Sequence, residues 1–573
     1  YLYAPSNVVF GNEIFNNPQR GIVMSSKNGN VIDSNIIYDN TLSGIYVGSS
    51  NHNISNNIIY NNSDFGLRLY ISSNNIIDSN DIYENQDQNI YLQSGSSNNI
   101  IKNNLAHNSD TDQGIYIVNT NCENNSIINN TVYENGNGGI WAGTWGSFVG
   151  PGNVISNNTV ANHTTNRGIF VEMNNSVISG NIVYNNKNAG IYLYQDSYNF
   201  SVYDNIVYDN PKVGIYPNRI YNSNISNNFG YNNTQQGLYL TNSDNNVIEY
   251  NNFSNNWISA SYGGANQFVN SKFNTFTGNR FFGSGDFLVR TYTNFNNNTF
   301  INNVFANSTD ELFRCGDGSS CDYNIFIGNT FETNGTNPGL RLVNAEGNMV
   351  IDSTHFGPGA NPEHSGAGNN TVYINTTWTN TNFGSANTFT RKWYLDVRVN
   401  TSDGNLENAN VSVFNNSDVL EFSELTDVSG SISRLNFTEY MYDETSYVYY
   451  GNYTINTTSP SGSYGNDSRE ANMSDNVFEY ITLSSTNSAP TDPSPSLTSV
   501  DGLNLTTSDL NCSATITDPD SNVLNVSVRW YNNSVLSLTV DYNNSYASGT
   551  LFNATLDSGN TTIGETWNCS MKL

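Results

Sequence analysis

A short phrase of sequence recurs along about the first two-thirds of this chain, and this repetition constrains the fold more than any other feature. Residues 30–50 read NVIDSNIIYDNTLSGIYVGSS, and residues 75–94 read NIIDSNDIYENQDQNIYLQS. Aligned on one Asn per copy, the repeat returns about every 22 to 28 residues, which is typical of solenoids. The aligned residues are Asn12, Asn35, Asn57, Asn80, Asn104, Asn130, Asn158, Asn181, Asn205, Asn228, Asn251, Asn279, Asn303 and Asn329.

Apolar residues stand at fixed offsets from the aligned Asn. One lies three positions before it and another two positions after it, as Ile32 and Ile37 do around Asn35. Further on, a Gly precedes an apolar–aromatic–apolar segment, such as GIYV at 44–47. This alternation turns the aliphatic side chains inward. One coil cannot bury its own inner face, but coils stacked about 4.8 Å apart can. The sequence predicts a parallel β-helix of about fourteen or more coils, roughly 70 Å long.

Two residue types fit the corners of such coils. The aligned Asn side chains are expected to form a ladder, with each amide bonding to the coils above and below. The Gly before the aromatic segment is expected to supply a positive φ. Asn89 replaces that Gly in one copy, and Asn is the next best residue for this conformation.

The composition indicates an all-β protein with no nucleic-acid partner. Asn, Ser, Thr, Tyr and Gly are abundant, whereas the residues that favour helix are scarce. The formal net charge of -29 repels phosphate, and it disfavours polyuronate chains unless a cation bridges them. No apolar run approaches the roughly 20 residues that span a bilayer, so no membrane insertion is expected within this segment. Because the chain opens at Tyr1, we interpret it as a processed or trimmed piece of a longer product.

Residues 7–378 resemble the right-handed parallel β-helix repeat families, which include pectate lyases, pectinases, epimerases, viral tailspikes and periplasmic proteins linked to copper-enzyme maturation. The resemblance rests on the repeat N-x-I-x-x-N-x-I-Y-x-N…G-I-Y, which specifies a fold and is almost silent on function. Pectinase-like activity implies clustered acids, lyase-like activity implies calcium-binding Asp with a basic residue, and a copper role implies His and Met clusters.

None of these constellations is present in the sequence. There is no Asp-Asp pair, and the five His residues are dispersed. Arg68, Glu172, Arg290 and Arg341 occupy outward positions far apart along the repeat, where lone charges on a solvated face are the simplest interpretation. The sequence therefore identifies no catalytic residue, no metal ligand and no cofactor, and it leaves the question of an enzyme open.

Aromatic residues form two outward stripes. The first holds Tyr46, Tyr91, Tyr116, Trp141, Phe170, Tyr192, Tyr216 and Tyr239. The second holds Phe15, Tyr38, Tyr60, Tyr83, Tyr133, Tyr184, Tyr208 and Tyr231. One interpretation is ring-on-ring stacking along the strands, worth about 0.5–1.5 kcal/mol per pair. The other is a platform that binds sugar or another protein, because exposed aromatic stripes are unusual in a free monomer.

Two β-sandwich domains are predicted after the β-helix of residues 1–378. Residues 391–485 resemble the transthyretin-like or carboxypeptidase-regulatory-like sandwich, and a Pro-rich linker spans residues 486–496. Residues 497–573 resemble an Ig-like domain, because Cys512, Trp530 and Cys569 follow the Cys…Trp…Cys order. The resemblance implies a Cys512–Cys569 disulfide, and the final strand of such a domain is missing. We expect both ends of the chain to be unfinished, either cut from a longer product or completed by neighbouring subunits.

The remaining cysteines and one acidic turn allow further predictions. Cys315 and Cys321 flank GDGSS and are predicted to close a small loop, whereas Cys122 is left over and suits a buried apolar site. Two disulfides indicate an oxidising, extracytoplasmic setting. Asp518 and Asp520 in DPDSN suit either a turn or a calcium contact.

Acceptors for N-glycosylation are enriched after residue 400, where about two-thirds of the Asn residues begin Asn-X-Ser/Thr. In the β-helix the excess is weaker, and it is of a size that chance is able to supply in large part. The predicted modified residues are Asn410, Asn415, Asn436, Asn452, Asn456, Asn525, Asn553 and Asn568.

Taken as a set, these features resemble archaeal surface proteins. The sequence predicts a structural, heavily N-glycosylated extracellular protein, a subunit of a filament, sheath or S-layer-like assembly with scope for adhesion. Its predicted partners are copies of itself and surface polysaccharide. The alternative is a polysaccharide-binding or polysaccharide-degrading β-helix protein.

Overall fold

The computed structural model describes residues 1–118, 121–143, 150–256, 263–284, 286–318, 320–359, 361–378, 382–383, 387–459 and 462–573. Residues 1–394 together with 436–451 form one compact unit, and residues 395–435 together with 452–573 form a second. The protein is all-β, and the described residues contain a single short helical turn, η1 (Ser558–Asn560).

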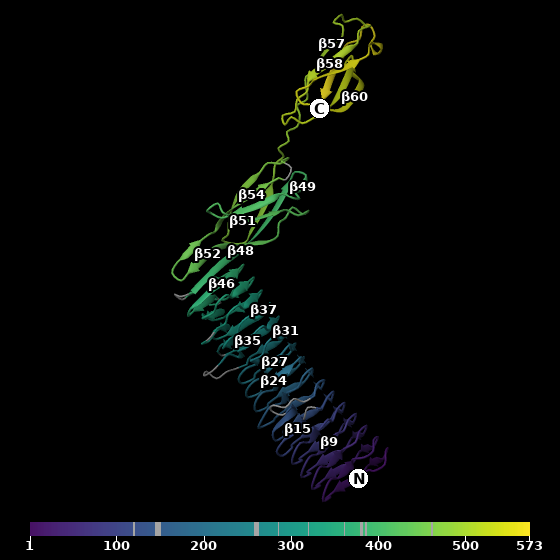
Figure 1. The fold of residues 1–573 in the computed structure, drawn as a ribbon, viewed down its shortest axis with the longest axis vertical. Coiled ribbons are helices and arrows are strands. Elements are labelled where there is room, and N and C mark those ends of the chain that lie inside the picture. Colours follow the sequence, from purple (N-terminus) through teal and green to yellow (C-terminus); the bar gives the residue numbers. More distant parts are fainter. Residues whose placement is uncertain are drawn as a thin grey trace. The chain divides into compact units, whose positions relative to one another are not determined.

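The first unit is a long parallel β-solenoid, in which each coil contributes one strand to each of three sheets (Figure 1). Sheet A contains β3 (Ile22–Met24), β6 (Ile45–Val47), β9 (Leu67–Tyr70), β12 (Ile90–Gln93), β15 (Gln113–Ile117), β18 (Gly138–Ala142), β21 (Ile169–Val171), β24 (Ile191–Tyr198), β27 (Ile215–Tyr221), β30 (Tyr239–Thr241), β33 (Asn266–Val269), β36 (Val289–Tyr292), β39 (Phe313–Cys315), β42 (Leu340–Val343), β45 (Pro362–Ser365) and β47 (Asn382–Phe383).

The other two sheets are built in the same way. Sheet B contains β1 (Val8–Phe10), β4 (Val31–Asp33), β7 (Asn53–Ser55), β10 (Ile76–Asp78), β13 (Ile100–Lys102), β16 (Ser126–Ile128), β19 (Val154–Ser156), β22 (Val177–Ser179), β25 (Ser201–Tyr203), β28 (Asn224–Ser226), β31 (Val247–Glu249), β34 (Thr275–Thr277), β37 (Thr299–Ile301), β40 (Ile325–Ile327), β43 (Met349–Ile351), β46 (Gly368–Ile374) and the first residues of β48 (Asn387–Thr401). Sheet C contains β2 (Glu13–Phe15), β5 (Ile36–Tyr38), β8 (Ile58–Tyr60), β11 (Asp81–Tyr83), β14 (Leu105–His107), β17 (Thr131–Tyr133), β20 (Thr159–Ala161), β23 (Ile182–Tyr184), β26 (Ile206–Tyr208), β29 (Phe229–Tyr231), β32 (Asn252–Ser254), β35 (Arg280–Ser284), β38 (Val304–Ser308), β41 (Thr330–Glu332) and β44 (Thr354–Phe356).

The apolar side chains at the repeat offsets fill the interior of the solenoid. Ile77 is fully buried and pairs in register with Ile54 on one neighbouring coil and Ile101 on the other. Burial of each such side chain contributes about 1.5–3 kcal/mol. In the later coils Phe replaces Ile, and the rings of Phe276 and Phe300 stack with centroids 4.5 Å apart.

The aligned Asn side chains connect one coil to the next. From Asn12 to Asn329, each Nδ2 donates to the Oδ1 of the next aligned Asn at 2.9–3.0 Å. Asn158 also donates to the carbonyl of Ile127 on the preceding coil at 2.9 Å. Apart from Asn12, which is exposed, these residues are buried.

Two further ladders run along the other corners, and sequence reasoning did not find them. One contains Asn17, Asn40, Asn62, Asn85, Asn135, His163, Asn186, Asn210, Asn233 and Asn256. The other contains Asn7, Asn30, His52, Asn75, Asn99, Asn125 and Asn153, and later Asn246, Asn274, Asn298, Asn324 and Asn348. In both, a His Nδ1 accepts the backbone N–H that an Asn oxygen accepts elsewhere.

The sequence predicted that the Gly before each sheet A strand has a positive φ, and this prediction is wrong. Gly190 does not have a positive φ, but a Cβ built there would lie 2.4 Å from Val207 Cγ1 and 2.9 Å from the Gly214 carbonyl oxygen. Close approach of adjacent coils therefore requires Gly. The positive φ occurs instead at the residue before the aligned Asn, as at Asn157, where φ is 56°.

A hairpin from later in the chain packs on the last coil. Strands β52 (Leu435–Asp443) and β53 (Tyr447–Tyr449) pair antiparallel, and Tyr440 is 6% exposed against the buried Phe389. Trp393 Nε1 donates to Glu439 at 2.7 Å. Residues 436–451 thus join the solenoid unit, whereas the sequence predicted a single middle domain over residues 391–485.

The second unit consists of small sheets. One joins β50 (Asn410–Phe414), β51 (Leu420–Leu425), β54 (Asn452–Thr458) and β55 (Asp467–Asn472), and β48 also pairs with β49 (Gly404–Asn405) and β56 (Val477–Thr482). Two three-stranded sheets follow, made of β57 (Ser496–Ser499), β58 (Leu510–Thr515) and β61 (Leu551–Leu556), and of β59 (Leu524–Asn532), β60 (Val535–Tyr546) and β62 (Trp567–Lys572). The Cys512–Cys569 disulfide joins these two sheets beside the buried Trp530.

Candidate functional site

Sheet A turns one side chain of each coil outward at the same position, and the predicted aromatic stripe Tyr46–Tyr239 lies on this sheet. In-register pairing places Tyr116 beside Trp141. The central coils differ from the prediction, because Trp141 and Tyr192 are each 4% exposed and Phe170 is fully buried. Tyr194 packs against this group, which forms a small core of its own outside the main one. The stripe is therefore not exposed over its whole length.

Two arginines in or next to the first half of sheet A lie against aromatic rings. The guanidinium of Arg20 is 4.5 Å from the Tyr46 ring centroid, and that of Arg68 is 5.0 Å from the Phe65 centroid. Such contacts contribute about 0.5–2 kcal/mol. The sequence interpretation of Arg68 as a lone solvated charge is therefore wrong, as it is for Glu172, whose side chain is fully buried.

The second half of sheet A presents a row of polar and aromatic side chains, which we call the Tyr–Arg row. It consists of Tyr216, Tyr239, Gln267, Arg290, Arg314, Arg341 and Glu363, all partly exposed. Parallel pairing sets their order, with Arg314 between Arg290 and Arg341 on successive strands. The Tyr216 and Tyr239 rings stack with centroids 4.6 Å apart. Sequence reasoning noted Arg290 and Arg341 but missed that the row is continuous.

Carboxylates from the corners, and one from the row itself, fix the arginines of this row. Glu311 Oε1 accepts a 2.7 Å hydrogen bond from Arg341, and its Oε2 lies 3.3 Å from Arg314 Nε. Arg341 also contacts Glu363 at 3.4 Å, and Arg290 pairs with Asp317. These arginines are therefore not the lone charges that the sequence suggested.

Glu311 is the centre of this ion-pair network and is 3% exposed. Burial raises the pKa of Glu311, while Arg314 and Arg341 oppose that rise. A buried carboxylate between two guanidinium groups holds them in fixed orientations. The arrangement offers planar rings, oriented donors and acceptors, and little net charge, which suits a ligand rich in hydroxyl groups.

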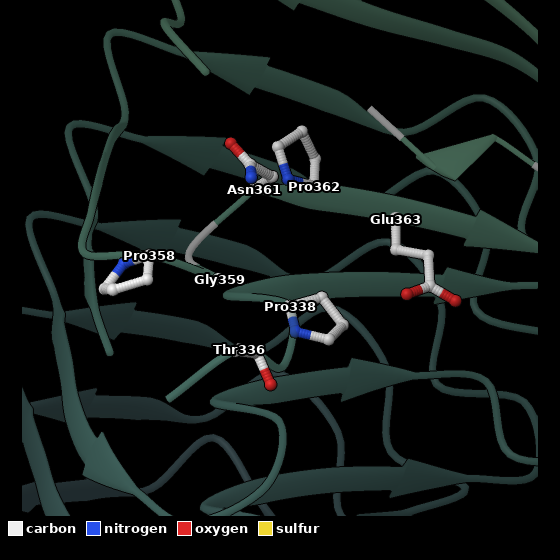
Figure 2. A pocket seen from close by; sticks show the side chains of 7 residues that line it. All are labelled: Thr336, Pro338, Pro358, Gly359, Asn361, Pro362 and Glu363. Atoms are coloured by element: carbon white, nitrogen blue, oxygen red, sulfur yellow. The ribbon is translucent and has the colours of Figure 1, made fainter. Parts of the chain in front are cut away.

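A hollow of about 200 Å³ adjoins the C-terminal end of the Tyr–Arg row. Figure 2 shows the rings of Pro338, Pro358 and Pro362 around it, with Glu363 at one side. Thr336, Gly359 and Asn361 complete the lining. Because Glu363 belongs to both features, the hollow extends the row.

The second predicted aromatic stripe lies on sheet C as a column of stacked rings. The Tyr38 and Tyr60 rings are 4.9 Å apart and 6° from parallel, and Tyr208 and Tyr231 are 5.0 Å apart and 2° from parallel. His107 takes a place in the same column, 4.7 Å from the Tyr133 ring. Here the structure matches the simple stacking interpretation.

The structure contains both predicted disulfides, and it shows how exposed each predicted glycan acceptor is. Disulfides link Cys315 to Cys321, with Cα atoms 5.6 Å apart, and Cys512 to Cys569, with Cα atoms 6.2 Å apart. Cys122 is buried without a disulfide. Among the predicted glycan acceptors, Asn436, Asn452, Asn525, Asn553 and Asn568 are exposed, and Asn410, Asn415 and Asn456 are partly exposed.

Within the described residues, no group of three or more His, Cys, Asp or Glu side chains could hold a metal ion. Asp518 Oδ1 accepts the backbone N–H groups of Asp520 and Asn522 at 2.8 and 3.2 Å, which is the geometry of a turn. Calcium at this position stays a prediction. Across the same described ranges, no helix is both long and apolar enough to span a bilayer.

Comparison with known proteins bears on the fold. Residues 1–160 and 148–281 match the family model described as "Right handed beta helix region". The solenoid is a right-handed β-helix. No curated protein matches the chain.

Three solved structures illustrate the likeness of this β-helix to known ones. A periplasmic alginate epimerase is 14% identical with a TM-score of 0.31, covering 62% of this chain and 76% of its own. A mannuronan C-5 epimerase module of Azotobacter vinelandii is 13% identical with a TM-score of 0.30, covering 63% and 89%. A pectate lyase is 11% identical with a TM-score of 0.30, covering 49% and 77%. These proteins are named for action on polysaccharides, but at these identities and TM-scores the likeness carries no argument about this chain.

Proposed function

We propose that this protein is an extracellular polysaccharide-binding β-helix protein, and that the Tyr–Arg row of sheet A holds a neutral glycan chain. The observation that carries the proposal is the continuous row from Tyr216 to Glu363, one partly exposed side chain per coil, with its arginines fixed by carboxylates. Two disulfides favour an extracytoplasmic setting.

Charge favours a neutral ligand over an anionic one. The chain has a formal net charge of -29, which repels a polyuronate at long range. Within the row, Arg290 pairs with Asp317, and Arg341 pairs with both Glu311 and Glu363. These guanidinium groups keep donor N–H groups for hydroxyl oxygens but supply little net positive charge.

Calorimetric titration of the full chain against neutral glucans, mannans and xylans, and against alginate and pectate, tests this function. Binding of at least one neutral glycan is expected, and Tyr239→Ala should weaken it about tenfold or more through loss of a stacked ring. Tyr208→Ala removes a ring from the sheet C column and is the matched control. The proposal fails if no neutral glycan binds, or if both substitutions weaken binding equally.

A structural role in a surface assembly is the second candidate. It is favoured by one observation, namely that none of the eight predicted acceptor Asn residues between 410 and 568 is buried. A β-solenoid followed by domains that carry sugars suits a filament, sheath or S-layer-like coat made of copies of this chain. Electron microscopy of the purified protein distinguishes the candidates, since a coat subunit forms ordered polymers and a binding protein stays dispersed.

A further inference from the structure

The coil pattern determines which Asn residues of the solenoid can be N-glycan acceptors. An aligned Asn is followed two positions later by an inward apolar residue, as Asn158 is by Val160 and Asn130 by Val132. An acceptor needs Ser or Thr at that position. None of the aligned Asn residues from 12 to 329 therefore begins an acceptor, and the same is true of the Asn residues in the other two ladders.

The residue immediately before a ladder Asn has the opposite properties. Asn129 and Asn157 have φ values of 58° and 56°, and both are exposed. Two positions later the chain has begun the next strand with an outward side chain, Thr131 or Thr159, so that an acceptor fits without disturbing the core. The corner acceptors of this kind are Asn61, Asn124, Asn129, Asn157, Asn232 and Asn297.

Adjacent Asn residues at one corner differ in whether their amide is available. Asn158 Nδ2 donates to Asn181 Oδ1 at 3.0 Å and to the Ile127 carbonyl at 2.9 Å, and it is 1% exposed. Within the described part of the chain, the exposed Asn157 Nδ2 donates no hydrogen bond. Modification of Asn157 would therefore leave the ladder intact.

The acceptors also avoid one side of the solenoid. Besides the six corner residues, the acceptors are Asn53, Asn162, Asn174, Asn199, Asn224, Asn252, Asn307, Asn334, Asn369 and Asn375, which lie on strands of sheets B and C or in the segments between strands. None of the strands from β3 to β45 that form sheet A contains an acceptor.

We propose that the β-helix is N-glycosylated at its corner Asn residues and that sheet A is its sugar-free side. In this reaction the Asn side-chain nitrogen bonds to the anomeric carbon of a lipid phosphate-linked oligosaccharide. The nitrogen loses one proton, and the lipid phosphate leaves. The inference is independent of the proposed function, because it concerns modification of the corners and not binding at the Tyr–Arg row.

Glycopeptide mass spectrometry of the full chain isolated from its native cells tests the proposal. We expect glycans at one or more of the six corner Asn residues and none on sheet A strands. The proposal is overturned if all six are unmodified, whether or not the acceptors after residue 400 carry sugar.

Two variants test whether a glycan detected at a corner is attached to the acceptor Asn of that corner. Thr159→Val removes the acceptor at Asn157 while keeping an outward β-branched residue next to Thr131 and Ile182. Asn157→Gly removes the amide at a position where the next coil has Gly180, which also has a positive φ. Both should lose the Asn157 glycopeptide with an unchanged unfolding midpoint. If the glycan mass persists in both variants, the assignment to Asn157 is overturned.

Discussion

Asn89 Nδ2 donates a 2.9 Å hydrogen bond to Oδ1 of Asn135, 46 residues later in the chain. The intervening coil has Ser109 at the ladder position, and Asn89 Oδ1 in turn accepts from Asn85 Nδ2 at 2.9 Å. The side chain of Asn89 thus fills a gap in the second ladder. Its φ is not positive, so the sequence explanation for Asn at this position is wrong.

This relationship predicts a compensating pair of substitutions. Asn89→Gly restores the residue found before other sheet A strands but leaves buried amides unpaired, which should destabilise the protein by about 1–3 kcal/mol. Ser109→Asn supplies the regular ladder residue, so the double variant should recover most of that loss. Chemical denaturation of the four proteins gives the coupling free energy, and simple additivity would contradict the account.

A ladder Asn and its corner neighbour should respond very differently to substitution. Asn158→Ala removes an acceptor for Asn130 and a donor to Asn181, so a loss of about 3 kcal/mol or more is expected. Asn157→Gly keeps the positive φ and should change the free energy of unfolding by about 0.5 kcal/mol or less. Equal effects, measured by denaturant unfolding, would argue against the ladder as the connection between coils.

The Gly residues before the sheet A strands should not tolerate substitution by a larger residue, because adjacent coils approach closely there. A Cβ at Gly190 would lie 2.4 Å from Val207 Cγ1, so Gly190→Ala should destabilise the protein by about 1–3 kcal/mol or more through overpacking. Gly335 is a suitable control, since its nearest neighbour atom would be 3.7 Å from an added Cβ. Thermal unfolding of both variants measures the difference, and a destabilised Gly335→Ala of equal size would undermine the steric explanation.

His163 should make stability depend on pH. Burial of the ring lowers the pKa of His163 from the ordinary 6.5 to about 4. In the folded protein its Nδ1 accepts the Asn135 N–H at 3.1 Å. The unfolded chain binds a proton more readily, so this stabilisation is complete above pH 6.5 and is lost as pH falls toward 4. The slope is at most about 1.4 kcal/mol per pH unit.

The control is His163→Asn, which places the usual ladder residue at this position. In that variant the pH dependence between 6.5 and 4 should be smaller than in the unmodified protein. Denaturant unfolding at a series of pH values gives both slopes, and identical slopes would show that His163 is not the titrating group.

The sequence predicted the solenoid and one ladder because both follow from fixed offsets within each copy. The other ladders escaped notice because His52, Ser109 and His163 interrupt the run of Asn, although both His residues accept the same backbone N–H as an Asn. The ion pairs of the Tyr–Arg row were also missed. Glu311 comes from a corner rather than a strand, and which coil it meets depends on register that no single repeat reveals.

The tyrosines of the Tyr–Arg row on sheet A and those of the stacked column on sheet C allow a direct test of the claim that sheet A binds the glycan. Hydroxyl-radical footprinting of the full chain, with and without a neutral glycan that it binds, measures the protection of each Tyr within a single sample. The account predicts protection of Tyr216 and Tyr239 on sheet A, with Tyr60 and Tyr208 on sheet C unchanged. Protection of the sheet C residues while sheet A stays unchanged would contradict it.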